Sequence, residues 1–224
     1  MENKVIVKRQ AETNLEYGCR PENRKIKDQV DYGVVVINKP AGPTSHQVAD
    51  YVKRILKIDK AGHSGTLDPN VTGVLAIALG RATRVVEILL KSGKEYVALM
   101  HLHDNADEEK VKEVFKEFTG KIMQMPPVKS AVRRRLRERE IFYLQSLEIN
   151  GKEVLFKVGC QAGTYIRKLI HDMGIKLGTG AHMQQLIRTK AGPFTDEEWH
   201  SLHDLKDAYE FYLQGDEKPL KKII

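Results

Sequence analysis

Apolar residues fall in short runs along the chain, and the spacing within each run predicts its secondary structure. Continuous apolar stretches at 33–40 (GVVVINKP), 73–79 (GVLAIAL) and 94–102 (KEYVALMHL) are typical of buried strands. The dipeptide Asn150-Gly151 separates two β-rich runs, which is the strongest hairpin signal in the chain. These segments predict a sheet with at least one tight antiparallel connection.

Helical spacing of apolar residues marks other segments. Residues 44–58 begin at a good N-cap, Thr44 or Ser45, and repeat apolar side chains every three to four positions. The same period runs through 104–120 and 164–178, and each of these segments ends at a glycine. Shorter helices are predicted at 81–90, at the start of 181–194 (which then becomes a strand) and at 201–213.

The order of these elements predicts the fold class. Strands and helices mix without strict β-α-β alternation, which favours an α+β body around a mixed, mainly antiparallel central sheet flanked by helices and loops. We expect three parts: an N-terminal arm (1–32) that packs on the body, a main domain (33–213) and a basic tail (214–224).

Composition narrows the class of protein further. With 224 residues, 41% of them hydrophobic, the chain can bury a sizeable core. It contains no 18-residue apolar window that would span a membrane, and the start, MENKVIVKRQ, lacks the apolar core of a secretory signal. Cys19 and Cys160 stand far apart, which argues against a zinc ribbon and fits a reducing compartment.

Positive charge is concentrated in one stretch. The net charge is +7, and residues 126–140 (PPVKSAVRRRLRERE) hold six basic side chains against two acidic ones. A block of arginines repels itself unless something anionic neutralises it, so we expect a phosphate-contacting loop here. A solvated, salt-bridged face is the alternative. The candidate contact residues are Lys129, Arg133, Arg134, Arg135 and Arg137.

Common catalytic motifs are absent from the sequence, including the P-loop, H-E-x-x-H and G-x-S-x-G, and no cluster has metal-ligand spacing. The remaining candidate is Asp68, in the segment HSGTLDPNVTGVLAIALG (63–80). An Asp-Pro pair usually forms a turn, but the surrounding glycines allow close backbone approach, and Ser64 and Thr66 can donate to a carboxylate.

A carboxylate at the edge of a core needs a partner, because an unpaired buried charge costs several kcal/mol. Arg167, at the start of a predicted helix in GTYIRKLIHD, is a candidate, and a surface arginine is the alternative. Tyr96, in KEYVALM, is a third polar residue on a buried strand, although a packed core tyrosine is the commoner outcome.

These residues lie in motifs that resemble, in order, those of the TruB family of RNA pseudouridine synthases. The similarity runs from about residue 21 to about residue 213. The motifs are NKPAGPTSHQV (38–48), HSGTLDPNVTGVLAIALGRATR (63–84), KEY (94–96), PPVKSA (126–131), CQAGTYIRKLIHDMG (160–174) and LIRTKAGPF (186–194).

Within this family the chain is closer to the archaeal and eukaryotic, dyskerin-like branch, whose members are catalytic subunits of H/ACA ribonucleoproteins. The short basic segment after Pro127 supports that branch over the bacterial one. Members of the branch carry a C-terminal PUA domain. The chain stops at Ile224, so we expect the tail 214–224 to lead to a PUA domain that is absent here.

The resemblance implies a pseudouridine synthase fold and a cofactor-free, metal-free isomerisation of uridine. Asp68 would be the catalytic aspartate, which either attacks C1′, stabilises a cationic sugar or assists proton loss at C2′. Arg167 would hold the carboxylate ionised and aimed. Tyr96 would stack on the extruded uracil and serve in proton transfer.

The resemblance also implies roles for residues that bind the substrate. His63 would help to hold the RNA where the target is flipped out, Tyr165 would line the pocket and Leu186 would form its apolar wall. Lys39 and Pro40 would support the catalytic loop. The basic residues at 129–139 would form a mobile thumb that grips RNA through its phosphates.

Three functions are compatible with the sequence. The first is an RNA-guided synthase acting on rRNA or tRNA with an H/ACA guide RNA and small companion proteins. The second is a stand-alone enzyme for the tRNA T-arm, and the third is a non-catalytic RNA-binding scaffold. The set of Asp68, Tyr96 and Arg167 argues against the scaffold. The expected location is the cytoplasm of an archaeal-type cell, or the nucleolus of a eukaryotic one.

Overall fold

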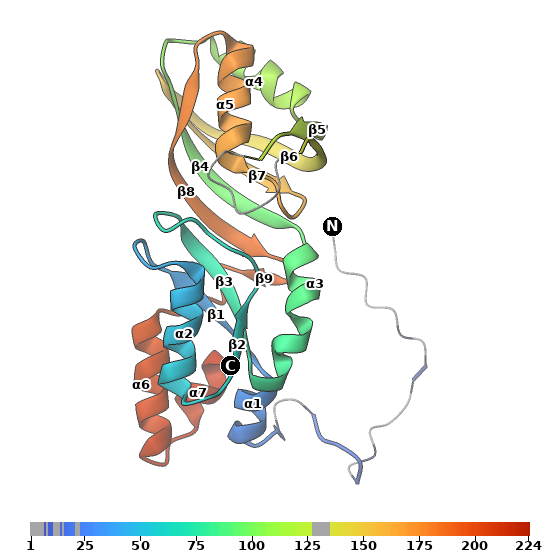
Figure 1. The fold of residues 1–224 in the computed structure, drawn as a ribbon, viewed down its shortest axis with the longest axis vertical. Coiled ribbons are helices and arrows are strands. Elements are labelled where there is room, and N and C mark those ends of the chain that lie inside the picture. The colour runs from blue at the N-terminus through green and yellow to red at the C-terminus, as the bar shows by residue number, and fades with distance from the viewer. Residues whose placement is uncertain (1–6, 8, 11–13, 15, 21–22, 127–134) are drawn as a thin grey trace.

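The computed structural model describes residues 7, 9–10, 14, 16–20, 23–126 and 135–224. Within these residues, one sheet has the strand order β1-β3-β8-β4-β7-β6-β5, with β2 paired to β3 and β9 paired to β8 (Figure 1). The strands are β1 (Val34–Lys39), β2 (Ala61–His63), β3 (Thr72–Leu79), β4 (Lys94–Leu102), β5 (Gly120–Gln124), β6 (Arg137–Asn150), β7 (Glu153–Cys160), β8 (Ala181–Ala191) and β9 (Phe194–Thr195).

Helices cover this sheet, and local sequence fixes where several of them begin and end. Thr44 and Ser201 each close a capping box at a helix start, and Gly178 ends a helix in the left-handed conformation. None of the helices among the described residues has the length and apolarity needed to cross a membrane. The helices are α1 (Ile26–Tyr32), α2 (Ser45–Leu56), the 3₁₀ helix η2 (Gly80–Val85), α3 (Val86–Lys91), α4 (Glu108–Glu117), α5 (Ile166–Leu177), α6 (Leu202–Leu213) and α7 (Lys218–Ile223).

Two large hydrophobic cores lie on the sheet, one in each half of the molecule, and a small third cluster of Val36, Val74 and Ala191 joins β1 and β3 to β8. The first core joins β4, β6, β7 and β8 to α4 and α5, in the upper part of Figure 1. The second joins β1 and β3 to α1, α2, α6 and α7, in the lower part. The ladders between the described strands are antiparallel except for β3–β8, which connects the two halves. We call this connection the seam.

The seam is narrow and depends on a glycine. Two residue pairs make it, Thr72–Ile187 and Gly73–Arg188. Gly73 has φ +111°, and a Cβ added there would lie 2.2 Å from the carbonyl oxygen of Arg188. Glycine is therefore required both by the backbone conformation and by the close approach of β8.

Most predicted elements are present, and the α+β class with a mainly antiparallel sheet is confirmed. The helix predicted at the start of 181–194 is wrong: β8 is extended from Ala181, where it pairs with Leu102 of β4. The helical preference of Met, Gln and Leu in this segment is overridden by sheet pairing. Similarly, the predicted loop through residue 139 is wrong beyond 136, because β6 begins at Arg137 and pairs with β5.

The predicted N-terminal arm and basic tail each contribute a helix that packs on the folded body. Within the predicted arm, α1 packs on the second core through Ile26, whereas Val7 and Tyr17 are 67% and 87% exposed. Within the tail, α7 places Leu220 in the same core, fully buried. Residues 218–224 are thus part of the folded body.

Candidate active site

Asp68 lies in the loop between β2 and β3, and the loop is fixed on both sides of it. The backbone N–H of Leu67 donates to Ser45 Oγ at 2.8 Å, and that of Val71 donates to the Asp68 carbonyl oxygen at 3.0 Å. Leu67 is buried, yet the Asp68 side chain is 54% exposed. The loop therefore holds its backbone rigid while presenting one carboxylate outward.

Lys39, at the end of β1, supports this loop from below. Its side chain is fully buried, and its Nζ donates to the carbonyl oxygens of Pro40, Pro69 and Val71 at 2.8, 3.0 and 3.0 Å. Burial, with the charge of Arg188 nearby, lowers the pKa of Lys39. The bonds to Pro69 and Val71 tie the segment that follows Asp68 to the end of β1, as expected for a supporting residue.

Arg167 is the second residue of α5, and its Nη2 makes an ion pair with Asp68 Oδ2. The predicted contact is therefore present. The expectation that the pair is buried is wrong, because both side chains are 54% exposed. Their attraction is moderated by water, and the pair is open to a large ligand. Asp68 belongs to the second half of the molecule and Arg167 to the first, so the pair spans the seam.

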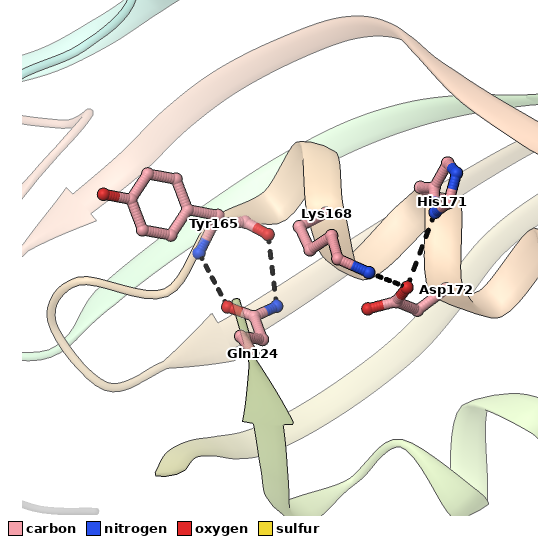
Figure 2. Close-up of polar contacts among 5 residues, drawn as sticks. All are labelled: Gln124, Tyr165, Lys168, His171 and Asp172. Carbon is pink, nitrogen blue, oxygen red and sulfur yellow. Dashed lines mark hydrogen bonds and ion pairs between the residues drawn. The ribbon is translucent and has the colours of Figure 1, made fainter. Parts of the chain in front are cut away.

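Tyr165 forms the N-cap of α5, and its backbone is held by Gln124 at the end of β5 (Figure 2). The Tyr165 N–H donates to Gln124 Oε1 at 3.1 Å, and Gln124 Nε2 donates to the Tyr165 carbonyl oxygen at 3.3 Å. Gln124 is buried and is not among the residues predicted from the sequence. It fixes the start of the helix that carries Arg167, and it sits where the basic segment leaves the sheet.

Tyr96 and Leu186 lie on the same face of the sheet. Tyr96 is on β4, and Leu186 is on β8 opposite Ala98. Both pack against the first core. Burial raises the pKa of Tyr96, so its phenol stays protonated at neutral pH. Arg188 is the cross-strand partner of Tyr96 on β8, and the nearby guanidinium charge opposes part of the effect of burial on the phenol pKa.

Arg188 is a further site residue that sequence reasoning missed. Its side chain is 1% exposed, and its Nε donates to the Val74 carbonyl oxygen at 2.7 Å. Its Nη2 donates to the carbonyl oxygen of Gly65, in the Asp68 loop, at 3.1 Å. The available signal was an arginine inside an otherwise half-apolar strand motif, LIRTKAGPF.

Lys94 adds a third buried cation near the loop. Its Nζ donates to the carbonyl oxygens of Leu89, Leu90 and Ser92 at 2.8, 3.0 and 2.7 Å. Burial, reinforced by Arg188, lowers the pKa of Lys94 to about 8. Lys39 and Arg188 thus bind carbonyl oxygens of the Asp68 loop, whereas Lys94 binds those at the end of α3.

His63 ends β2 and contacts α2 rather than Asp68. Its Nδ1 accepts from the Gly65 N–H at 3.3 Å, and its Nε2 lies 2.8 Å from His46 Nδ1. Burial, then the neighbouring His46 and Arg188, lowers the pKa of His63 to about 4. The ring is therefore neutral with its proton on Nε2. Both histidines line a surface hollow of about 380 Å³ between α2 and α3.

The basic segment is described in part. Lys129, Arg133 and Arg134 lie outside the described residues, and Arg135 is exposed. Arg137 pairs with Gln124 at the start of β6. Arg139 donates from Nε to the Gly163 carbonyl oxygen at 3.1 Å, so this arginine supports the loop before α5.

The described residues provide an outward carboxylate paired with a guanidinium, and a protonated phenol whose cross-strand partner, Arg188, binds the Asp68 loop. Such a site can stabilise or attack an electrophilic carbon and can donate a hydrogen bond to a bound base. Among the described residues, no three His, Cys, Asp or Glu side chains form a group that could hold a metal ion.

Three family models cover the chain. The model of the TruB family pseudouridylate synthase N-terminal domain matches residues 53–166. The model of the tRNA pseudouridylate synthase B C-terminal domain matches residues 167–224, and the DKCLD (NUC011) domain model matches residues 1–49.

Similar proteins come from archaea. "Probable tRNA pseudouridine synthase B" of Methanocaldococcus jannaschii is 58% identical over 221 residues, which are 98% of this chain and 66% of the relative. The protein of the same name from Methanopyrus kandleri is 54% identical over 100% of this chain and 66% of the relative. The chain thus spans about two thirds of the length of these relatives.

Two solved structures have the same fold. "Crystal Structure of a Cbf5-Nop10-Gar1 Complex" matches with a TM-score of 0.91 and 55% identity, over 95% of this chain and 65% of that chain. "Structure of H/ACA RNP bound to a substrate RNA containing 2'-deoxyuridine" matches with a TM-score of 0.87 and 52% identity, over the same shares. The family resemblance of the motifs is confirmed: the chain belongs to the TruB family of pseudouridylate synthases, in the archaeal branch that carries a DKCLD domain.

Proposed function

We propose that this chain isomerises uridine to pseudouridine in RNA, with Asp68 as the reacting carboxylate. The observation that carries the proposal is the Asp68–Arg167 ion pair, half-exposed on a rigid loop between the two halves of the molecule. A half-exposed carboxylate can be reached by the ribose of a nucleotide that has left its stack. Membership of the TruB family supports the same reaction.

The reaction breaks the C1′–N1 bond, rotates the uracil and joins C1′ to C5. The C5 proton is lost and N1 gains a proton, so no oxidant or cofactor is consumed. Asp68 would act at the ribose, by attack on C1′, by stabilising a cationic sugar or by assisting proton loss at C2′. Arg167 would keep the carboxylate ionised and directed.

Tyr96 would contact the base rather than the sugar. Because burial raises the pKa of its phenol, Tyr96 acts as a stacking surface and hydrogen-bond donor and not as a phenolate base. Leu186, on the same face of the sheet, would close the pocket on the apolar side. His63 and Tyr165 would hold neighbouring parts of the RNA and the pocket edge.

The RNA would be selected by a guide. The related solved structures are described as an H/ACA RNP with a substrate RNA and as a complex with Nop10 and Gar1, which supports a guided reaction with small companion proteins. The basic residues Arg135 and Arg137, with Lys129, Arg133 and Arg134, would contact RNA phosphates. A stand-alone tRNA reaction is the second candidate, favoured by the names of the curated relatives.

An isomerisation assay tests this proposal. Wild type, Asp68→Asn and the matched exposed control Asp196→Asn are given a guided target and free tRNA, each with and without companion proteins. We expect Asp68→Asn to lose on the order of 10³-fold or more in turnover, with RNA binding kept within a few fold and the control unchanged. Appreciable turnover by Asp68→Asn contradicts the assignment, and turnover on free tRNA without a guide selects the second candidate.

A further inference from the structure

The strands β4 and β8 change register by one residue beside Tyr96. On one side of the change, Glu95 pairs with Lys190. The next residue, Tyr96, pairs with Arg188, which leaves Thr189 as the extra residue of a β-bulge. With regular pairing Tyr96 would face Thr189, and Arg188 would lie on the opposite face of the sheet. The bulge therefore brings Arg188 beside Tyr96.

Side-chain contacts hold the bulge in place. Thr189 Oγ1 donates to Glu95 Oε1 at 2.7 Å, so the extra residue is bonded to the strand it bypasses. The other carboxylate oxygen of Glu95 accepts from the Tyr143 hydroxyl, and Lys157 Nζ lies 3.5 Å from Oε1. These contacts come from β6 and β7, so three neighbouring strands fix the position of the bulge.

The guanidinium of Arg188 contacts three different parts of the site. It donates to the carbonyl oxygen of Val74 on β3 and to that of Gly65 in the Asp68 loop, and it lies beside Tyr96, the cross-strand partner of Arg188. A guanidinium has donors and no acceptor, so toward the Tyr96 oxygen it can only donate. With Arg188 as the donor, the Tyr96 O–H would point in another direction, toward a bound base.

We propose that Arg188 is a positioning residue for the isomerisation. Arg188 fixes the position of the Tyr96 hydroxyl relative to the Asp68 loop, and the bulge at Thr189 places Arg188 beside Tyr96. The proposal rests on the proposed function for its catalytic consequence, but the Arg188–Tyr96 contact can be tested without any activity. Because Arg188 acts through groups that touch the substrate, its loss lowers kcat more than it raises KM.

The first test reads the contact directly. 3-Fluorotyrosine, whose phenol is more acidic than that of tyrosine, is introduced at position 96 and titrated by ¹⁹F NMR in wild type, Arg188→Met and Arg188→Lys. Loss of the adjacent cation and donor moves the phenol ionisation to higher pH in Arg188→Met, and by less in Arg188→Lys. Lys190→Met, two residues along β8 and exposed, is the matched control and leaves the titration unchanged. An unchanged titration in both Arg188 variants overturns the proposal.

The second test reads the catalytic consequence. Arg188→Met lowers kcat about 100-fold with KM within a few fold, because the reacting groups are misplaced rather than removed. The effect of Arg188→Met shrinks in a Tyr96→Phe background, where the hydroxyl it positions is absent. If the effects of the two substitutions on kcat are fully additive, the positioning role is overturned. An inactive wild type contradicts the proposed function instead, and the ¹⁹F result remains valid.

A milder variant covers the case in which Arg188→Met does not fold. Thr189→Val keeps the shape of the side chain and removes the hydroxyl that anchors the bulge to Glu95. We expect a kcat about 10-fold lower and a shifted ¹⁹F signal at position 96, with the thermal midpoint within a few degrees of wild type. A Thr189→Val protein with wild-type kcat and an unshifted signal overturns the role of the bulge.

Discussion

Arg188 Nε lies 2.7 Å from the carbonyl oxygen of Val74, and this buried bond joins β8 to β3 across the seam. Each half of the molecule contributes part of the site: the Asp68 loop comes from one, and Arg167 and Tyr96 come from the other. The relative position of these groups is therefore set by how the two halves meet. Substitutions at the seam should affect function before they affect either core.

Gly73→Ala should disrupt the seam. An alanine Cβ would meet the Arg188 carbonyl oxygen at 2.2 Å, and its backbone would be held at φ +111°. We expect the free energy of unfolding to fall by about 3 kcal/mol or more. Gly120→Ala is the matched control, because Gly120 has φ +100° with nothing within 4 Å of an added Cβ. Equal losses in urea unfolding would mean that backbone conformation, not the close approach, decides the cost.

Lys39→Met should loosen the Asp68 loop. Methionine retains an apolar stem like that of lysine but lacks the Nζ group. The carbonyl oxygens of Pro40, Pro69 and Val71 therefore lose their donor. We expect about 2 kcal/mol lower stability and faster amide exchange at residues 66–72. Lys94→Met is the matched comparison, since Lys94 caps α3 and its loss should speed exchange at 88–92 instead. The same exchange pattern in both variants would contradict separate roles.

Stability should fall on acidification through His63. Its pKa is lowered from the ordinary 6.5 to about 4, so between these values the unfolded chain binds a proton that the folded chain does not. The contribution of His63 is therefore complete above pH 6.5 and is lost as the pH falls toward 4. Urea unfolding of wild type and His63→Gln at pH 7.5 and pH 4.5 measures it. The stability gap between the two pH values should be smaller in His63→Gln, and an unchanged gap would exclude this histidine as the source.

Gln124→Glu should displace the start of α5. One carboxylate oxygen can still accept from the Tyr165 N–H, but the other replaces a donor and faces the Tyr165 carbonyl oxygen. We expect about 1 kcal/mol lower stability and a kcat about 10-fold lower, because Arg167 lies two residues further along. Gln145→Glu, exposed on β6, makes the same chemical change as a control. Normal turnover in Gln124→Glu would show that the Arg167 position does not depend on this contact.

Periodicity predicted the elements whose contacts are local or regular. The strands β1, β3 and β4 and the helices α2, α4 and α5 lie within a few residues of the predicted ranges, because capping residues and apolar repeats decide them. β8 was mispredicted at its start, since an isolated MQQL favours a helix until β4 is available as a partner.

Part of the candidate site could be predicted from family motifs rather than from periodicity. Asp68, Arg167 and Tyr96 stand in motifs of a known family, so order along the chain identified them. Arg188 and Gln124 bond mainly to backbone carbonyl and amide groups, which leave no complementary side chain in the sequence. The bulge that aims Arg188 is one unpaired residue, and a pattern of period two does not reveal it.

The two cores have no buried side chain in common. Each large core can therefore be repacked by itself, whereas exchanging one half with the equivalent half of a relative must also preserve the small cluster of Val36, Val74 and Ala191, which crosses the seam. Such chimaeras must also keep Gly73 opposite Arg188, the carbonyl groups that receive its guanidinium and the Asp68–Arg167 pair. For an engineer, substitutions deep in one large core are the ones expected to change thermal tolerance with the least effect on reaction geometry, whereas substitutions at the seam change both.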